Sequence, residues 1–395
     1  MTSSTTKPGL AAALREVLRP GMTVAIGDGA GTVRELEDGT NVCAELSAAA
    51  ADIGSLRLVL GWAPGTLNGL DSASFAAIAA LVPSGSVRSV LQNPLAHFVP
   101  SRLSAIPALL AGPLRPDVLI TRLVKRDGQY RFGTEVSYQR ALVDSGVPVL
   151  AVIDDAAPSA SAEPALDPDR VRVIGRSNDG PAHMHREPEP LHDALADEVL
   201  RFVPAGARLQ YGPGQLGTAL LRRAAVPLRI DTGMLTDAVV DLERHGMLVG
   251  EPSATYLVGT DVLYHWADTR PILRGIEHTH DLTRLSRGEP FVAVNTAIEI
   301  DPVGQINVEG VGDKLVGGIG GHPDYCAAGA MSRGGLSIIA VPSSTNGRSP
   351  LVEQLSRPAS TPAHDVDVIV TEAGHADLRG ADWSQRRRMI HDLFS

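Results

Sequence analysis

The sequence lacks several features that would mark a secreted, membrane or nucleic-acid-binding protein. Its 395 residues include two cysteines, Cys43 and Cys326, too few for a disulfide framework, so a reducing cytoplasm is expected. The first eight residues lack the apolar core of a signal peptide, and no apolar run approaches the length of a membrane span. The net charge of -10 argues against general nucleic-acid binding, which needs a basic surface. We therefore expect neither a membrane nor a nucleic acid as a partner.

Motifs of several enzyme classes are also missing. No Gly-x-Ser-x-Gly elbow is present, so the triad of an α/β-hydrolase is not supported. The loop 27–31 (GDGAG) resembles a dinucleotide loop but lacks the full spacing and the later acidic residue. The segments 277–281 (EHTHD) and 183–185 (HMH) offer no third spaced ligand, which favours solvated loops over a metal site. No metal is expected.

The sequence does contain short apolar runs that alternate with helical patterns. In the first half, strands are expected at 22–26, 56–61, 87–91, 118–121 and 147–153, and helices at 10–19, 32–52, 73–82 and 135–144. This alternation predicts a mostly parallel sheet covered by helices on both faces. Residues 155–188 are rich in Ala, Ser, Pro and Asp, and only 170–175 has a strand pattern. We place a domain boundary there, with domains at 1–185 and 186–395.

The second half opens with the same order of elements as the first. A helix at 191–202, a Pro-Ala-Gly turn, a strand at 207–210 and the loop 212–214 match the helix, Pro-Gly turn, strand and glycine loop of 10–31. This repetition suggests two similar α/β domains derived by duplication. Further strands are expected at 254–259, 290–300, 335–342 and 366–372, with a basic helix at 385–391.

The most unusual segment is the glycine-dense stretch 311–325 (VGDKLVGGIGGHPDY), between the apolar runs 290–300 and 335–342. Glycines so close together let the backbone approach a ligand and direct several N–H groups into one space. Taken alone, the stretch is also consistent with tight turns between strands.

Seven segments carry a resemblance to a known family. They are 99–107 (VPSRLSAIP), 115–118 (RPDV), 127–133 (DGQYRFG), 209–214 (LQYGPG), 295–307 (NTAIEID with GQIN), 318–325 (GIGGHPDY) and 365–374 (DVDVIVTEAG). In this order they resemble the acetyl-CoA hydrolase/transferase family, a single-chain branch of the class I CoA-transferases. The resemblance extends from about residue 20 to the C-terminus. It implies two similar α/β domains with mostly parallel sheets and the active site between them, an acyl-CoA substrate and a homodimer.

One segment departs from the family at the catalytic residue. The stretch 229–242 (RIDTGMLTDAVVDL) resembles the family's GIHTEMxSDGxVDL, and Gly233 stands where the family has its nucleophilic glutamate. A glycine has no side chain and cannot form a glutamyl-CoA thioester. The alternative is that this register is misplaced and that Glu243 or Glu251 serves instead.

The resemblance also implies the site residues. The residues expected to bind CoA are Gly212, Pro213, Gly214, Gly318, Ile319, Gly320 and Gly321. Asn295 is expected to hold an oxyanion or a carbonyl group. His322 replaces a glutamine of the family and can act as a base or acid near neutral pH, and Asp231 replaces a histidine and can orient His322 or bind a hydroxyl group. Purely structural functions for His322 and Asp231 stay open.

These residues lead to three hypotheses. The first is an acyl-CoA hydrolase that works without a glutamyl-CoA intermediate. It would attack either the thioester or a ring ketone of a CoA-linked β-dicarbonyl, as the similar ring-opening hydrolases of steroid breakdown do. The second is a CoA-transferase that uses another carboxylate, and the third is a non-catalytic CoA-binding partner protein. In each case coenzyme A, carried by an acyl-CoA, is the expected ligand.

Overall fold

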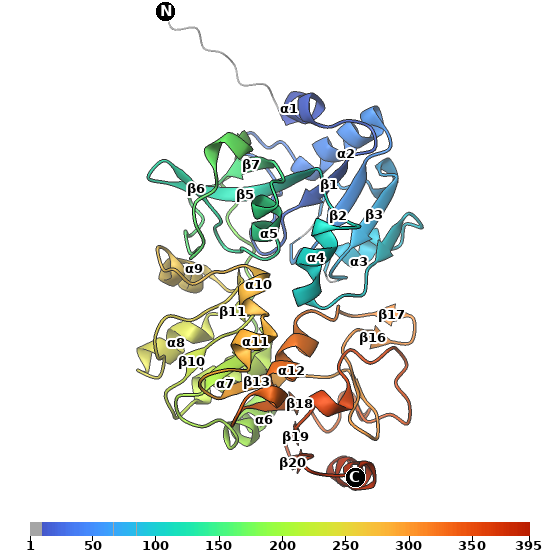
Figure 1. Cartoon of the computed structure of the whole chain (residues 1–395), viewed down its shortest axis with the longest axis vertical. Coiled ribbons are helices and arrows are strands. Elements are labelled where there is room, and N and C mark those ends of the chain that lie inside the picture. The colour runs from blue at the N-terminus through green and yellow to red at the C-terminus, as the bar shows by residue number, and fades with distance from the viewer. Residues whose placement is uncertain (1–9, 66, 84) are drawn as a thin grey trace, which may run out of the picture. The chain divides into compact units, whose positions relative to one another are not determined.

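The computed structural model describes residues 10–65, 67–83 and 85–395, which fold into two units (Figure 1). The first unit contains the chain up to Val99 together with Pro107–Ala182, and the second contains Pro100–Ile106 and His183–Ser395. The segment Pro100–Ile106 therefore belongs to the second unit, although its neighbours on both sides belong to the first. Residues 155–182 fold with the first unit.

The first unit is built on a sheet with the strand order β4-β3-β2-β1-β5-β7-β8, whose neighbours are all parallel, and β6 pairs antiparallel with β5. The strands are β1 Thr23–Ile26, β2 Arg57–Leu60, β3 Ala77–Ala80, β4 Ala96–Phe98, β5 Val118–Arg126, β6 Gln129–Arg131, β7 Val149–Ile153 and β8 Val171–Arg176. The helices are α1 Leu10–Val17, α2 Val42–Ile53, α3 Val87–Val90, α4 Ile106–Ala111 and α5 Gln139–Asp144, with short 3-10 turns η1 Ser72–Ser74 and η3 Pro168–Arg170. Every residue of β7 is buried, as expected for a parallel strand covered on both faces.

Two predicted elements of this unit have the wrong type, and the expected helix at 32–52 begins only at Val42. The expected helix at 73–82 is instead the turn η1 followed by strand β3, which pairs residue by residue with β2. Its alanines favour a helix intrinsically, but burial between two strands outweighs that weak preference. The expected strand at 87–91 is helix α3, in which Val87 and Val90 lie three residues apart and are both buried.

The second unit contains a sheet with the order β10-β9-β13-β18-β19-β20, in which only β20 is antiparallel to its neighbour. These strands are β9 Arg208–Tyr211, β10 Arg229–Ile230, β13 Phe291–Asn295, β18 Leu336–Ala340, β19 Val368–Thr371 and β20 Gly374–Asp377. Three small pairs are formed by β11 Met234–Leu235 with β12 Tyr256–Leu257, β14 Glu299–Ile300 with β15 Ile306–Asn307, and β16 Gly310–Val311 with β17 Lys314–Leu315. The predicted fold class, α/β with two mostly parallel sheets, is confirmed.

Helices surround this second sheet. They are α6 Pro190–Leu200, α7 Gln215–Arg223, α8 Ala238–Arg244, α9 Asp261–Ala267, α10 Ile276–Thr279, α11 Leu282–Leu285, α12 His322–Met331 and α13 Trp383–Leu393, with 3-10 turns η2 Leu103–Ala105 and η4 Ala363–Asp365. Helix α12 packs against β13 and β18, and one apolar cluster there includes Tyr325, Phe291 and Ala328. Burying a large apolar side chain of this kind contributes roughly 1.5–3 kcal/mol. The core therefore fixes the position of α12 and of the glycine loop before it.

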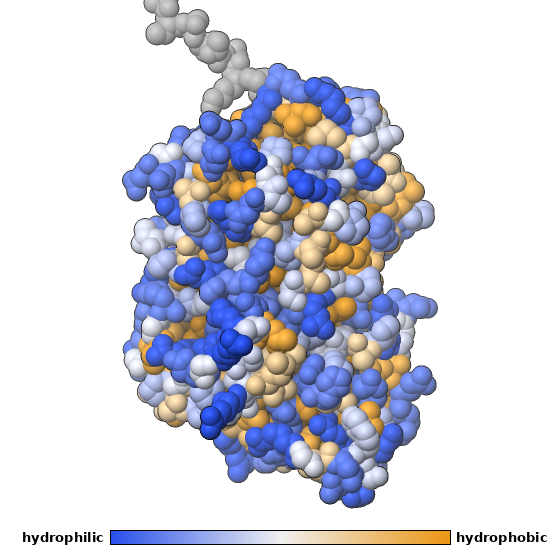
Figure 2. Space-filling view, viewed as in Figure 1, coloured by the Kyte–Doolittle hydropathy of each residue, from blue (hydrophilic) through white to orange (hydrophobic). Residues whose placement is uncertain are grey.

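The remaining observations concern the hydropathy of the surface, the length of the helices and the state of the two cysteines. On the face shown in Figure 2, hydrophilic residues interrupt the apolar ones. No helix in the described part of the chain is both long and apolar enough to span a membrane. Cys43 and Cys326 are both buried and free.

Candidate functional site

The loop after β9 opens onto free space at the carboxyl edge of the second sheet, where α/β proteins usually bind ligands. It contains Gly212 and Gly214, and Gly214 is the N-cap of α7. A Cβ atom added to either glycine would meet no atom within 4 Å. Gly217 differs, because a Cβ added there would lie 2.0 Å from the carbonyl oxygen of Gly212. Helix α7 therefore packs directly on the loop, while the other side of the loop stays open.

A cavity of about 230 Å³ lies at this edge. Six residues predicted to form the site line it: Gly212, Gly214, Asn295, Gly318, Ile319 and His322. Leu216, Leu220 and Val308 add apolar side chains to the wall. Pro213 and Gly320 adjoin these residues in the chain, whereas Gly321 faces a histidine outside the cavity. An apolar wall with a few polar groups suits part of a long ligand that carries amide and thioester groups.

Asn295, at the end of β13, lines the cavity, and hydrogen bonds hold its side chain. Its amide nitrogen donates to Gln210 Oε1 at 3.1 Å and contacts Cys326 Sγ at 3.6 Å, and its Oδ1 accepts from Gln210 Nε2 at 3.4 Å. The two amide hydrogens therefore already have partners. Its function as an oxyanion donor stays a prediction, and that function would require one of these bonds to open.

His322 is the first residue of α12 and uses both ring nitrogens. Nε2 lies 2.9 Å from the carbonyl oxygen of Thr296, which can only accept, so Nε2 carries the proton. Nδ1 lies 2.7 Å from Thr361 Oγ1 and accepts from it. Burial lowers the pKa of His322 to about 4, so the ring is neutral at neutral pH. In this arrangement His322 has no free lone pair with which to deprotonate water, and its catalytic function stays a prediction.

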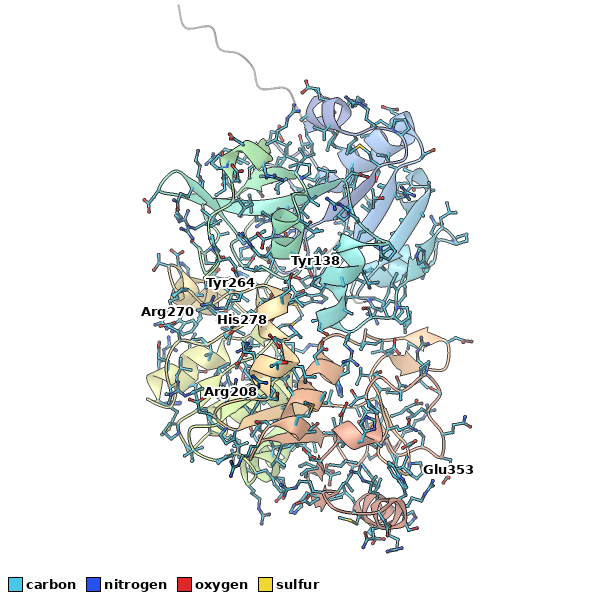
Figure 3. The ribbon with its side chains drawn as sticks, in the orientation of Figure 1. Tyr138, Arg208, Tyr264, Arg270, His278 and Glu353 are labelled. Atoms are coloured by element: carbon cyan, nitrogen blue, oxygen red, sulfur yellow. The ribbon has the colours of Figure 1, made fainter. Side chains whose placement is uncertain are left out.

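Asp231 follows β10 and is buried in an ion pair. Its Oδ2 and Oδ1 accept from Arg284 Nη1 at 2.7 Å and from Arg284 Nη2 at 2.8 Å. Arg208, labelled in Figure 3, places its Nη1 3.6 Å from Asp231 Oδ2. Both carboxylate oxygens thus bind arginine. Orienting His322 or binding a hydroxyl group stays a prediction for Asp231, and either function would require this ion pair to open.

Gly233, which the motif resemblance aligns with the family's glutamate, faces two buried aromatic rings. A Cβ atom added to Gly233 would lie 3.3 Å from Tyr325 Oη and 3.7 Å from His280 Nε2. The alternative carboxylates, Glu243 and Glu251, both interact with Arg270. Glu243 accepts from Trp266 Nε1 at 2.5 Å and from Arg270 Nη1 at 2.8 Å. Glu251 lies 3.9 Å from Arg270, which is labelled in Figure 3.

His280 is a residue that the sequence did not mark as functional. We expected 277–281 to be a solvated loop, and for His280 this is wrong, because it lies between α10 and α11 and is only 2% exposed. Its ring stacks at a tilt on Tyr325, with ring centroids 4.6 Å apart. The local sequence signals only a helix start, since Asp281 accepts from the N–H groups of Thr283 and Arg284. The burial arises from helix packing that no local pattern encodes.

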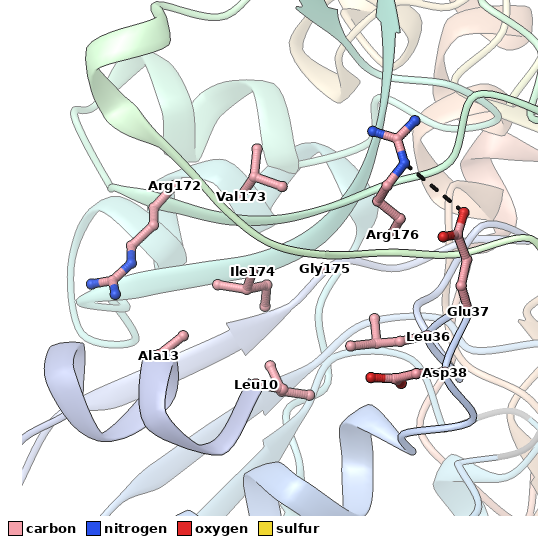
Figure 4. Close-up of a pocket in the computed structure, with 10 residues that line it drawn as sticks. All are labelled: Leu10, Ala13, Leu36, Glu37, Asp38, Arg172, Val173, Ile174, Gly175 and Arg176. Carbon is pink, nitrogen blue, oxygen red and sulfur yellow. Dashed lines mark ion pairs between the residues drawn. The ribbon is translucent and has the colours of Figure 1, made fainter. Parts of the chain in front are cut away.

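A second cavity, of about 490 Å³, lies in the first unit beside α1 and β8 (Figure 4). Leu10, Leu36 and Ile174 supply apolar walls. Of the charged groups at its border, Arg172 is paired with Glu16, and Arg176 lies 3.9 Å from Glu37. Paired charges offer no reactive group, so this cavity is the weaker candidate for a catalytic site. No cluster of three or more His, Cys, Asp or Glu side chains suited to a metal ion occurs among residues 10–65, 67–83 and 85–395.

Comparison with known proteins gives related sequences and folds. Residues 259–393 match the model of the acetyl-CoA hydrolase/transferase C-terminal domain. The chain is similar to the 4-hydroxybutyrate coenzyme A transferase of Clostridium kluyveri, with 25% identity over 338 residues, or 80% of this chain and 78% of that protein. It is also similar to the acetyl-CoA hydrolase of Candida albicans, with 26% identity over 257 residues, or 58% of this chain and 48% of that protein.

Among solved structures, RipA from Yersinia pestis has the same fold. Its TM-score is 0.87 at 22% identity, and the match covers 98% of this chain and 93% of that chain. At this identity the likeness concerns the fold alone. The match extends over both units of this chain.

Proposed function

Because the chain belongs to the acetyl-CoA hydrolase/transferase family, we propose that it acts on an acyl-CoA thioester and releases CoA by hydrolysis. The observation that carries this proposal is Gly233, which has no side chain and which the motif resemblance places at the position of the family's glutamate. Without a carboxylate there, the acyl group cannot pass through a glutamyl thioester at that position. Water then becomes the acceptor of the acyl group.

The reaction would be a single addition and elimination. The oxygen of water bonds to the thioester carbonyl carbon, the C–S bond breaks, and the sulfur leaves with the electron pair. The products are a carboxylic acid and the CoA thiol. The open loop with Gly212 and Gly214, and the cavity wall with Gly318 and Ile319, would receive the CoA arm. Asn295 would lie near the carbonyl group, as the family resemblance implies.

Transfer of CoA to a second carboxylate is the other candidate, and sequence similarity favours it. The relative named as a transferase matches 80% of this chain, whereas the relative named as a hydrolase matches 58%. A transferase mechanism would need a carboxylate nucleophile, which Gly233 cannot supply. Glu243 and Glu251 are the alternatives from sequence, and both interact with Arg270.

Oxygen labelling separates the two reactions. The protein is incubated with acetyl-CoA or butyryl-CoA in water enriched in oxygen-18, with and without added propionate. Label in the released carboxylate and no dependence on propionate would support hydrolysis. Propionyl-CoA without label, together with a thioester trapped by borohydride, would establish transfer instead. Binding of both compounds without either product would overturn an enzymatic function for these substrates.

Two further properties accompany the proposal. The family resemblance implies a homodimer, which sedimentation analysis would test. The two buried free cysteines are consistent with a reducing cytoplasm, and localisation of a tagged protein would check this.

A further inference from the structure

A short segment from much earlier in the chain holds the glycine loop before α12. Leu103 N–H donates to the carbonyl oxygen of Gly320 at 2.9 Å. The next residue, Ser104, donates from its backbone N–H to Asp324 Oδ2 at 3.1 Å and from its hydroxyl group to Asp324 Oδ1 at 2.6 Å. All of these groups belong to the second unit. We call residues 102–104 the strap, because they join the end of the loop to the first turn of α12.

The two attachment points of the strap flank residues that line the cavity of about 230 Å³. Gly318 and Ile319 line it just before Gly320, and His322 lines it just before Asp324. Two neighbouring strap residues therefore fix the loop on one side of His322 and the helix on the other. The spacing between the glycine wall and α12 depends on both bonds.

The opposite end of the loop is attached to Glu309. The carbonyl oxygen of Glu309 accepts from Val316 N–H at 2.7 Å and from Gly317 N–H at 3.1 Å. Between the two attachments, the N–H groups of Gly318 and Ile319 donate to no acceptor in the described part of the chain. Glycine also loses more conformational freedom on folding than any other residue. The position of this cavity wall is therefore set by its two ends, one of which is the strap.

The contact between Ser104 and Asp324 fixes a position and buries little apolar surface. Ser104 is exposed, whereas Asp324 is only 3% exposed. The ion-pair partner of Asp324, Arg102, is distant and half exposed, with 3.7 Å between Nη1 and Oδ1. Burying a carboxylate with so distant a cation is unfavourable. In return, the two oxygens accept both donors of one serine, which fixes distance and orientation together through strong charge-assisted bonds.

We propose that the strap is a positioning element of the acyl-CoA site, with Ser104 and Asp324 as its positioning residues. The inference rests on the proposed function, because it requires the CoA arm to lie in the cavity of about 230 Å³. The strap acts through Gly320 and the first turn of α12, and it sets how closely the glycine wall contacts the arm. Neither positioning residue lines the cavity, so their effect is on binding and not on the reacting groups.

The test uses variants of this contact and a matched control. Ser104→Ala removes the hydroxyl donor, Asp324→Ala removes both acceptors, and Ser104→Thr keeps a hydroxyl group. The double variant completes a double-mutant cycle. Ser74→Ala in the first unit is the control, because Asp71 there accepts from the hydroxyl group of Ser74 at 2.9 Å and from the N–H of Ala73 at 3.0 Å.

Each variant is tested for binding and for stability. Calorimetry measures the affinity for CoA and for pantetheine, which is the arm without the nucleotide. Urea titration measures unfolding, and steady-state kinetics with acetyl-CoA and butyryl-CoA separates KM from kcat.

We expect Ser104→Ala and Asp324→Ala to weaken the binding of both compounds by at least about tenfold, less than the roughly 100-fold that a 1 Å misplacement can cause. The double variant should bind no more weakly than Asp324→Ala, because the hydroxyl group has no carboxylate partner left. Ser104→Thr and Ser74→Ala should stay within about twofold of the natural protein. KM should rise with the loss of affinity, and kcat should change by less than about threefold.

The pattern of losses decides the inference. Equal losses for CoA and pantetheine support an effect on the wall that holds the arm. A loss for CoA alone would place the effect at the nucleotide and overturn this assignment. A lower urea midpoint with unchanged affinity would show that the contact is merely structural, which also overturns it. If Asp324→Ala does not fold, the comparison of Ser104→Ala with Ser104→Thr decides, because this side chain is exposed.

Failure of the inference differs from failure of the proposed function. If the natural protein incorporates oxygen-18 and Ser104→Ala binds CoA as tightly as the natural protein, hydrolysis stands and the positioning function of the strap is wrong. If the natural protein binds CoA and pantetheine but incorporates no oxygen-18, hydrolysis falls, and the binding comparison still decides the inference. If the natural protein binds neither compound, the cavity is not a CoA site and both fall.

Discussion

Strands β1 and β9 each run into a glycine-rich loop, yet the surroundings of the two loops differ. In the first unit, Cβ atoms added to Gly29 and Gly31 would lie 2.6 Å and 2.4 Å from carboxylate oxygens of Glu135. In the second unit, Cβ atoms added to Gly212 and Gly214 would meet nothing within 4 Å. The first loop is thus closed by a side chain of its own unit, whereas the second is open to a ligand.

This difference shows that one sequence pattern can serve two purposes. A helix, a Pro and Gly turn, a strand and a glycine loop begin both halves of the chain. In the first unit glycine permits close packing, with Gly31 N–H donating to Glu135 at 2.9 Å. In the second unit glycine leaves room at the cavity.

The largest expected effect is on the stability of the first unit. Gly31→Ala would press a methyl group against Glu135 and Thr134, and overpacking of this kind costs about 1–3 kcal/mol. Gly212→Ala is the matched control and should change the free energy of unfolding by less than about 0.5 kcal/mol. Urea titration measures both. Equal losses at the two positions would contradict the contrast between the loops.

Acid should change the stability of the two units in opposite directions. Burial raises the pKa of Glu135 from 4.5 to about 7, so its stabilising effect is complete below about pH 4.5 and is lost as the pH rises through 7. Burial lowers the pKa of His280 from 6.5 to about 3, so its stabilising effect is complete above pH 6.5 and is lost as the pH falls towards 3. Each group changes stability by at most about 1.4 kcal/mol per pH unit.

Hydrogen exchange resolved by peptide measures this pH dependence in each unit, after correction for the intrinsic exchange rate. Between pH 7.5 and pH 5, protection should rise in the first unit and fall in the second. Glu135→Gln should flatten the first slope. His280→Asn should reduce the second, to which His322 also contributes because burial lowers its pKa to about 4. A parallel change in both units would show that other groups dominate.

A smaller effect is expected on ligand binding. Gly212→Leu would fill part of the cavity of about 230 Å³, and we expect CoA binding to weaken by at least about tenfold, which equals about 1.4 kcal/mol. Calorimetry with CoA measures this, and Gly212→Ala should have an intermediate effect. Unchanged affinity in the leucine variant would place the CoA arm elsewhere.

The smallest effect should be equal in the two units. Gly21 and Gly206 end corresponding turns with φ angles of +82° and +79°, and neither would have an atom within 4 Å of an added Cβ. Alanine at either position therefore adds backbone strain alone, about 1 kcal/mol. Thermal unfolding of the two variants compares the costs. A difference above about 1 kcal/mol would mean that the turns are not equivalent.

The sequence predicts the parts of the fold that depend on local pattern. The buried runs at 118–121 and 147–153 became β5 and β7 because continuous apolar character identifies a strand covered on both faces. The helix predicted at 73–82 was wrong because alanine suits both a helix and a covered strand. Pairing with the neighbouring strands β2 and β4 makes residues 77–80 a strand. The excursion of Pro100–Ile106 has no local signal, since its contacts lie far along the chain.

The candidate site was predictable to the extent that motifs defined it. Motif resemblance selected Gly212, Asn295 and His322, and the structure places all three around one cavity. The sequence could not show that both nitrogens of His322 are occupied, because Thr296 and Thr361 reach it through tertiary folding. His280 was missed for the same reason, since its free nitrogen depends on packing against Tyr325.

The excursion of Pro100–Ile106 has a consequence for biosynthesis. Leu103 N–H donates to the carbonyl oxygen of Gly320, and Ser104 donates to Asp324, which lies 220 residues later. On the ribosome this segment emerges long before its partners exist. It therefore cannot form its contacts with the second unit until most of the chain has been made. Two halves produced by a cut after Ala182 would likewise leave the C-terminal half without this segment. Such a half could regain it only by reassociating with its other fragment.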